Sequence, residues 1–148
     1  MALEHDIIAR TTEPHDFQIQ PGPILIVDDE PVFVDLISSI LCASGYQCVG
    51  VHSAREALKR AMEHPQPAVA LVDLKLPDCE GTILIRQLRL QIPKLPVLAI
   101  SGSEIPEHAK EARAAGALEF LAKPFNCEEL LALLAHHRLT PQALNTAG

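Results

Sequence analysis

The chain has 148 residues, of which 48% are hydrophobic and 3% aromatic, and its formal net charge is −7. This length suits one domain whose core is filled by aliphatic side chains, and the hydrophobic fraction argues against intrinsic disorder. An acidic chain is repelled by phosphate backbones, so nucleic acid is a poor partner, and no apolar run approaches the roughly 20 residues that cross a bilayer. Because no basic segment followed by an apolar stretch opens the sequence, we expect a cytoplasmic protein with no membrane association.

Five similar units follow an N-terminal tail, which we expect over residues 1–23 because charges and prolines mix there without a sustained period. Each unit has a short apolar run, typical of a strand buried on both faces, and then a segment with helical spacing. The expected strands cover residues 24–27, 46–51, 68–72, 96–100 and 117–122. The expected helices cover residues 31–44, 53–63, 80–91, 104–115 and 126–137.

Several residues mark where these helices begin and end. Pro31 suits a first helical turn, Ser53 with Glu56 matches a capping box, and Gly45 and Gly116 are typical stops. Strands that alternate with helices predict an α/β domain with a parallel sheet covered on both sides. We expect this domain to span residues 24–138 and residues 139–148 to form a frayed C-terminal tail.

The chemistry-bearing residues follow the strands. The first strand ends in Asp28 and Asp29, the third in Asp73, the fourth in Ser101 and the fifth in Lys123. In open α/β sheets the functional site lies beyond the carboxyl ends of the strands, so these side chains are expected to meet. Three carboxylates repel one another, and a hard divalent cation, Mg²⁺ or Mn²⁺, relieves that repulsion. An aspartate beside such an ion can act as a nucleophile toward phosphorus, while a lysine and a hydroxyl stabilise the transferring group.

Each of these residues alone also has a purely structural interpretation. Asp28 and Asp29 could cap a helix, Ser101 could belong to an ordinary turn, and Lys123 could be a solvated surface lysine. The combination favours function, because four strand ends each carry the residue type that the chemistry needs.

Four segments resemble the receiver domain of bacterial response regulators, and the resemblance covers residues 24–137. They are I-L-I-V-D-D-E-P at 24–31, L-V-D-L-K-L-P at 71–77, L-A-I-S-G at 98–102 and E-F-L-A-K-P-F at 119–125. The resemblance implies a doubly wound, flavodoxin-like (β/α)5 fold with strand order 2-1-3-4-5. It also implies a cis peptide bond between Lys123 and Pro124.

The same resemblance implies a role for each site residue. Asp73 is the expected phosphoacceptor, Ser101 and Lys123 are the hydroxyl and lysine that assist it, and Phe120 is the aromatic switch. The expected metal ligands are Asp28, Asp29, Asp73 and the backbone carbonyl of Lys75. Lys75 and Ser103 also occupy places that influence the lifetime of the phosphoryl group, and we hypothesise that the Lys75 ammonium changes its hydrolysis.

The implied function is a phosphorylation-activated receiver domain of a two-component signalling system, which catalyses only its own phosphorylation and dephosphorylation. The implied partners are a histidine kinase or phosphotransfer protein upstream and an effector protein downstream. About ten residues follow the domain, too few for a DNA-binding domain, so we expect the signal to leave by protein contact. The surface of residues 104–115, 117–122 and 126–137 is a possible homodimer interface.

Two alternatives remain open. An aspartate-nucleophile phosphatase of the haloacid dehalogenase type also uses Asp, Ser or Thr, Lys and Mg²⁺, but it carries D-x-D on its first strand, where this chain has adjacent Asp28 and Asp29. A receiver fold that no longer takes phosphate is the second alternative, and the intact acidic, hydroxyl and lysine positions argue against it.

The cysteines and the paired histidines are expected to have no role in the chemistry. Cys42, Cys48, Cys79 and Cys127 show no zinc-site spacing, and we expect them to be buried small hydrophobes in a reducing compartment. His136 and His137 are expected to lie in the last helical turn, where a cation suits the helix dipole, although a metal site is the other interpretation.

Overall fold

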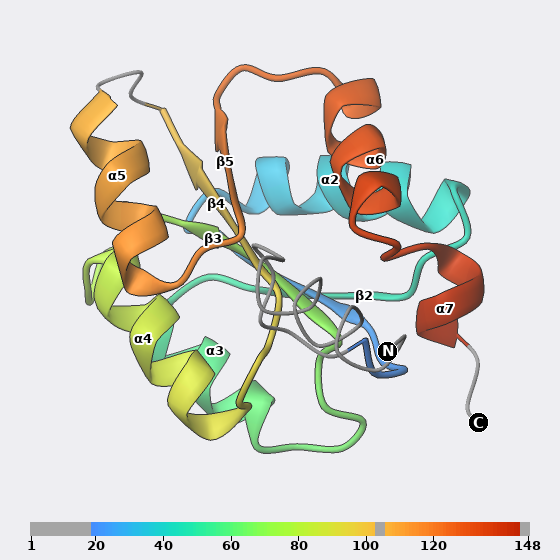
Figure 1. The fold of residues 1–148 in the computed structure, drawn as a ribbon, viewed down its shortest axis with the longest axis horizontal. Helices are drawn as coiled ribbons and strands as arrows, with labels where there is room; N and C mark the ends of the chain where they lie inside the picture. Colours follow the sequence, from blue (N-terminus) through green and yellow to red (C-terminus); the bar gives the residue numbers. More distant parts are fainter. Residues whose placement is uncertain (1–18, 103–105, 146–148) are drawn as a thin grey trace, which may run out of the picture.

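Five parallel strands form one sheet in the order β2-β1-β3-β4-β5, which confirms the expected topology (Figure 1). The structure is a computed structural model that describes residues 19–102 and 106–145. The strands are β1 (Ile24–Val27), β2 (Cys48–Val51), β3 (Val69–Asp73), β4 (Val97–Ser101) and β5 (Glu119–Ala122). The helices are α2 (Pro31–Ala43), α3 (Ala54–Ala61), α4 (Gly81–Gln91), α5 (Pro106–Ala115), α6 (Cys127–His136) and α7 (Pro141–Asn145).

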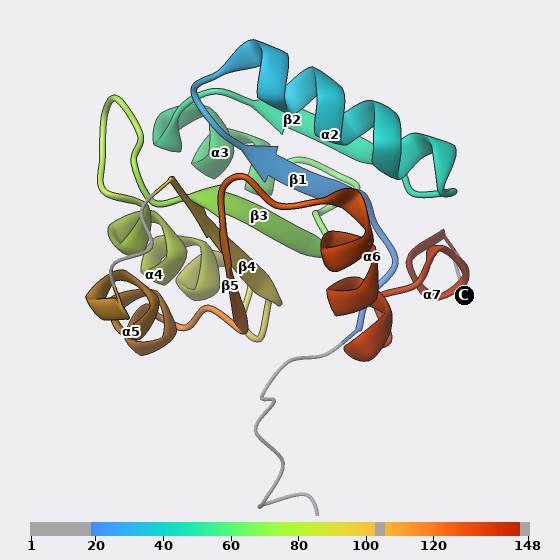
Figure 2. The same cartoon turned by 90° about the horizontal axis from the view of Figure 1, so that it is seen from above.

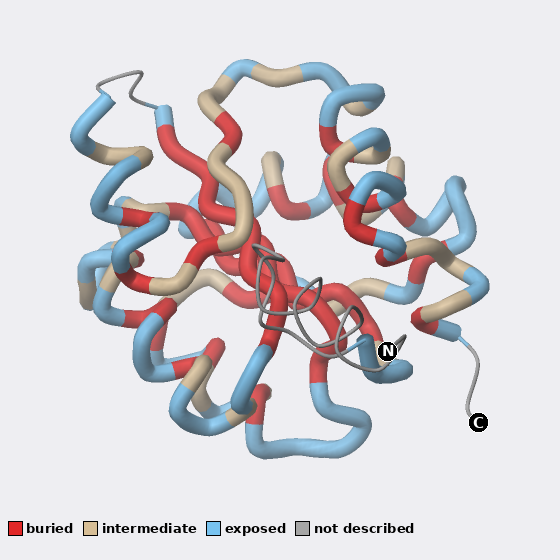
Figure 3. The backbone as a smooth tube through the Cα atoms, viewed as in Figure 1, coloured by how far each residue is buried: buried red, intermediate tan, exposed pale blue. Residues whose placement is uncertain are grey.

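The central strands are buried on both faces because helices cover both sides of the sheet (Figures 2 and 3). In β1, Leu25 and Val27 face a core shared with α3, α4 and α5, whereas Ile24 and Ile26 face a core shared with α2 and α6. Successive strand residues point to opposite faces, so an uninterrupted apolar run fills both cores at once. None of the helices in the described ranges combines the length and apolar character that a bilayer crossing requires.

Local sequence signals place the helices that border the site. The Ser53 side chain accepts a hydrogen bond from the Glu56 backbone N–H, as expected, while the Glu56 carboxylate accepts the N–H of His52. A complete capping box of Asn126 and Glu129, which the sequence analysis did not single out, begins α6. These caps satisfy backbone groups that the first helical turn leaves without a partner.

The chain end differs from the expected frayed tail. Residues 141–145 form α7, and Leu139 and Leu144 are buried in the same core as Ile24. The Tyr46 hydroxyl donates to the Leu139 carbonyl at 2.7 Å, and the Gly22 N–H donates to the Leu144 carbonyl at 2.8 Å. Segments before and after the expected domain bounds therefore pack onto it, whereas residues 1–18 of the expected N-terminal tail lie outside the described residues.

The cysteines and the paired histidines also differ from expectation. All four cysteines are free thiols, but Cys42 is exposed and the other three are only half-buried, so none is a fully buried core residue. His137 is buried rather than simply placed in the last helical turn, and its Nε2 lies 2.8 Å from Oε2 of Glu119. This contact joins the end of α6 to β5.

Candidate functional site

The carboxyl edge of the sheet brings together the acidic residues that the sequence singled out. Asp28 follows β1, Asp73 ends β3, and both are buried, whereas Asp29 is exposed. One oxygen from each of the three carboxylates lies within 4.8 Å of the other two. Ser101 is the last residue of β4 and is also buried. It follows Ile100, which is the register partner of Asp73 on the neighbouring strand β3. The site is therefore built on strand ends that the two cores hold in place.

Lys123, the residue that follows β5, extends its ammonium group to this cluster. Its Nζ lies 2.7 Å from Oδ2 of Asp28, 3.2 Å from Oε1 of Glu30 and 3.7 Å from Oδ2 of Asp73. The backbone N–H of Lys123 donates to the carbonyl of Ser101 at 2.7 Å, so the lysine begins from a fixed position. The peptide bond between Lys123 and Pro124 is cis, as expected from the resemblance.

The acidic cluster perturbs the protonation of Asp73. Burial raises the pKa of Asp73 to about 6, and the neighbouring Asp28 carboxylate raises it too, although the Lys75 N–H and the Lys123 charge act in the opposite direction. Burial alone would lower the pKa of Lys123, but its contacts with Asp28, Asp73 and Glu30 hold that pKa above its ordinary value. Burial is therefore the main cause of the raised pKa of Asp73, and the Lys123 charge offsets it only in part.

The loop of residues 74–80 carries Lys75 and is held at both its ends. The Lys75 N–H donates to Oδ1 of Asp73 at 3.0 Å, and Gly81 donates its N–H to the Leu74 carbonyl at 2.9 Å. Gly81 has to be a glycine here, because a Cβ at this position would collide with the backbone of Asp73 and Leu74. The base of the loop is thus closed directly beside the acidic cluster.

Asp78, which the sequence analysis did not identify, holds the tip of this loop. Its Oδ1 accepts the N–H of Ala54 at 2.9 Å and its Oδ2 accepts the N–H of Arg55 at 3.0 Å, both in the first turn of α3. These two hydrogen bonds lower the pKa of Asp78. A carboxylate at a helix N-terminus is a familiar sequence signal, but this one comes from more than 20 residues away along the chain, so no local pattern reveals it.

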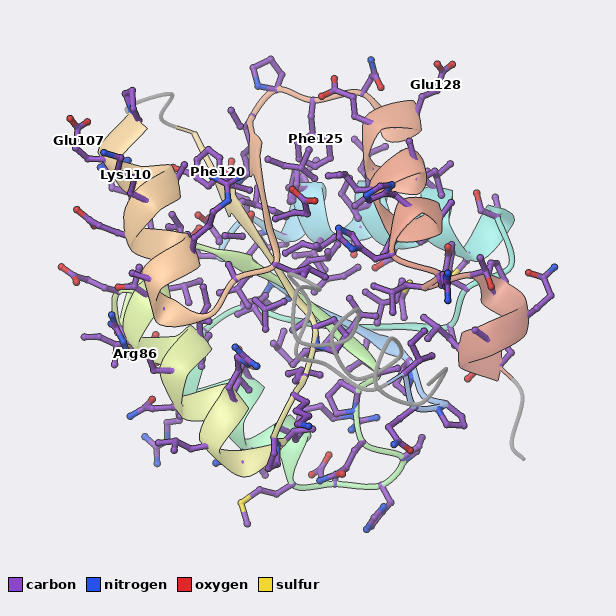
Figure 4. All side chains as sticks on the ribbon, in the orientation of Figure 1. Arg86, Glu107, Lys110, Phe120, Phe125 and Glu128 are labelled. Atoms are coloured by element: carbon purple, nitrogen blue, oxygen red, sulfur yellow. The ribbon has the colours of Figure 1, made fainter. Side chains whose placement is uncertain are left out.

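A cavity of about 690 Å³ borders the site on the side of α4 and α5. The described residues that line it include Lys75, Glu80, Ser101, His108 and Glu111. Phe120 is half-buried on β5, packs against the core shared with α3, α4 and α5, and lies on the α5 side of the strand (Figure 4). Ser103 lies outside the described residues.

The family model of the response regulator receiver domain matches residues 24–135. The DNA-binding transcriptional regulator NtrC of Proteus hauseri is 31% identical over 131 residues, which are 86% of this chain and 28% of that protein. A CheY-like response regulator receiver domain protein from Methanospirillum hungatei has a similar structure, with a TM-score of 0.73, 31% identity and coverage of 80% of this chain and 94% of that one.

A response regulator protein from Burkholderia pseudomallei, solved with a phosphorylated aspartic acid, calcium ion and citrate, is similar too. Its TM-score is 0.70 and its identity 31%, with coverage of 80% of this chain and 74% of that one. The chain spans about half the length, or less, of the curated relatives it matches. Since the family match covers the whole sheet and every residue of the acidic cluster, the chain belongs to the response regulator receiver domain family.

Proposed function

We propose that this receiver domain accepts a phosphoryl group on the carboxylate of Asp73. The observation that carries the proposal is that the Asp73 carboxylate lies close to two further carboxylates and one ammonium group. Asp73 Oδ1 already accepts the Lys75 N–H, which leaves Oδ2, on the Lys123 side, as the nucleophilic oxygen. The similar Burkholderia pseudomallei protein, which holds a phosphorylated aspartic acid, supports this assignment.

A divalent cation, Mg²⁺ or Mn²⁺, fits the residues present. The cluster offers only oxygen donors, which hard cations prefer, and the pKa of Asp73 is raised by its burial and by the neighbouring Asp28 carboxylate. Asp29, Asp73 and the Lys75 carbonyl are the proposed direct ligands. Asp28 would act through water, because its oxygens already accept the Glu30 N–H and the Lys123 ammonium. The bound ion would neutralise oxygens of the transferring phosphoryl group.

Ser101 and Phe120 are the proposed parts of the switch. Phosphorylation adds a charge of about −1.5 to −2 and strong acceptor oxygens, and the Ser101 hydroxyl is placed to donate to them. Movement of Ser101 at the end of β4 changes the space beside Phe120 on the neighbouring strand β5. The result is a shift between two packings of the α5–β5–α6 surface, not a new fold.

The partners follow from this chemistry. A histidine kinase or phosphotransfer protein supplies the phosphoryl group, and an effector protein, or a second copy of the chain, reads the α5–β5–α6 surface. Apart from catalysing its own phosphorylation and dephosphorylation, the domain has no proposed enzymatic turnover, and it works in the cytoplasm.

Incubation with phosphoramidate or acetyl phosphate and Mg²⁺ tests the proposal. We expect intact-mass measurement to show one added phosphoryl group on the wild type, none on Asp73→Asn and none when EDTA removes the metal. Asp35→Asn, which changes an exposed aspartate on α2, is the matched control and should behave as the wild type. A folded wild type that gains no mass would support the alternative of a receiver fold that takes no phosphate.

The Lys75 side chain is exposed beside the site, and we propose that its ammonium alters the hydrolysis of the acyl phosphate. The lifetime of phosphorylated Lys75→Ala is then expected to differ from that of the wild type, as followed by loss of the added mass. Equal lifetimes would refute this role.

A further inference from the structure

An aromatic ring forms one wall of the site beside the Lys123 ammonium. Nζ of Lys123 lies 4.1 Å from the centroid of the Phe33 ring, over its face. Phe33 belongs to α2 and is half-buried, and Lys123 keeps 18% of its side chain exposed. The chain has only four phenylalanines, and no expectation drawn from the sequence concerned this one.

The contact gives the ammonium an uncharged partner in addition to the acidic residues. The carboxylates of Asp28, Glu30 and Asp73 contact Nζ, whereas the Phe33 ring attracts the same charge through its quadrupole and carries no charge of its own. The ring also shields one side of the ammonium from water, which strengthens its remaining electrostatic interactions.

We propose that Phe33 is a positioning residue that holds the Lys123 ammonium beside Asp73 for phosphoryl transfer, a role that rests on the proposed function of Lys123. An incoming phosphoryl group must draw Nζ away from the carboxylates that bind it, because an ammonium has only three donors. The Phe33 ring uses no hydrogen-bonding site of the phosphoryl group and does not compete with it for charge. Since Nζ is already 3.7 Å from Oδ2 of Asp73, the lysine can exchange partners without leaving the ring.

A second aromatic residue fixes the direction in which the ring faces. The centroids of Phe33 and Phe125 are 6.0 Å apart, and their planes meet at 83°, the edge-to-face arrangement that aromatic pairs favour. Phe125 lies in the loop between β5 and α6, and projects toward α2 (Figure 4). Lys123 and Phe125 of one loop therefore contact the same ring, so the loop and α2 are positioned together.

The test is a double-mutant cycle on the rate of phosphorylation by phosphoramidate with Mg²⁺. Phe33→Leu retains an apolar side chain but removes the π face, Phe33→Tyr retains the face, and Lys123→Met retains the length of the stem without its charge. In the protein that retains Lys123, we expect Phe33→Leu to slow phosphorylation about three- to tenfold and Phe33→Tyr to be phosphorylated at close to the wild-type rate. In the Lys123→Met background, Phe33→Leu is expected to cause no further slowing, because no ammonium remains to be positioned.

A structural role alone would give a different pattern. Equal slowing by Phe33→Leu in both backgrounds, or no slowing in either, would overturn the inference. An independent readout is the NMR shift of the Lys123 side-chain methylene protons next to Nζ, which the ring is expected to move upfield in the wild type and not in Phe33→Leu. Unshifted methylenes in the wild type would also overturn it.

The outcomes separate this inference from the proposed function. If the wild type is phosphorylated and Phe33→Leu is phosphorylated at the same rate, only the positioning role of Phe33 is contradicted. A folded wild type that is never phosphorylated overturns both.

Discussion

The two ends of the sheet differ in what they bury: apolar side chains at one end and charged side chains at the other. At the amino-terminal end, the segment after α6 places Leu139 and Leu144 in the core, and the Tyr46 hydroxyl donates a buried hydrogen bond to the Leu139 carbonyl. At the carboxyl end, Asp28 and Asp73 are buried side by side with their negative charge only partly compensated. The amino-terminal end is stabilised by apolar burial, whereas the carboxyl end loses stability at the site where we propose that a cation and a phosphoryl group bind.

The largest expected effect is a loss of stability at the amino-terminal end of the sheet. Leu139 is fully buried, so Leu139→Ala should lower the free energy of unfolding by about 2–5 kcal/mol, as truncation of a core leucine typically does. Urea unfolding followed by circular dichroism measures this change. Leu90→Ala, which truncates an exposed leucine of α4, is the matched control and should change the stability little. A similar loss for both variants would contradict a special contribution of the C-terminal segment.

The next largest effect has the opposite sign, because it removes the buried carboxylate of Asp73 at the carboxyl end of the sheet. Because the pKa of Asp73 is about 6 in the folded chain against 3.8 for the unfolded group, its ionisation costs stability, which is lost as pH rises from 4 to 6. Without metal at pH 7, Asp73→Asn should therefore be more stable than the wild type, by at most about 3 kcal/mol. The difference should vanish near pH 4 and shrink when Mg²⁺ is added.

Urea titrations at pH 4, 5.5 and 7 in EDTA measure that difference. Asp35→Asn serves again as the control, because its exposed carboxylate faces no such cluster. Parallel pH profiles for the wild type and Asp73→Asn would show that ionisation of Asp73 costs no stability in the folded chain.

A smaller loss is expected from Tyr46→Phe at the amino-terminal end of the sheet. This variant keeps the buried ring but removes the hydroxyl that donates to the Leu139 carbonyl at 2.7 Å, leaving a buried acceptor without that donor. Such a loss typically costs about 1–3 kcal/mol. Chemical denaturation followed by circular dichroism checks the value, and an unchanged midpoint would mean that another donor replaces the hydroxyl.

The smallest expected effect is local, at the carboxyl end of the sheet. Asp78→Ala removes the acceptors of the Ala54 and Arg55 amides, so these two N–H groups should exchange with solvent faster than in the wild type. Amide hydrogen exchange by NMR measures this, with Ser53→Ala as the control that instead exposes the Glu56 amide. Unchanged protection of Ala54 and Arg55 would show that the loop of residues 74–80 is not held by α3.

The sequence predicts the parts of this molecule that follow a short-range pattern. Continuous apolar runs such as Ile24–Val27 identify the buried strands, and the known geometry of open α/β sheets then gathers Asp28, Asp73 and Lys123 at one edge. The same reasoning misses contacts between residues far apart in the chain. Asp78 reaches α3 across more than 20 residues, and Phe33 meets Lys123 across 90, with no motif that announces either contact.

Composition misleads in a similar way at the chain end. The small and polar residues at this end predict fraying, but Leu139 and Leu144 are buried, and their carbonyls accept hydrogen bonds from Tyr46 and Gly22. The burial of His137 against Glu119 likewise depends on where α6 crosses β5, which periodicity does not specify.

Tyr46 has a practical consequence for anyone who studies the switch by optical methods. The chain holds one tyrosine and no tryptophan, and that tyrosine lies against Leu139, beyond the opposite end of β1 from the acidic cluster. Its ultraviolet emission is therefore expected to report on unfolding around Leu139 rather than on changes at the phosphoryl site. The fluorescence of the native tyrosine is suited to following unfolding. Fluorescence titrations of a ligand at the phosphoryl site need a tryptophan introduced near α5.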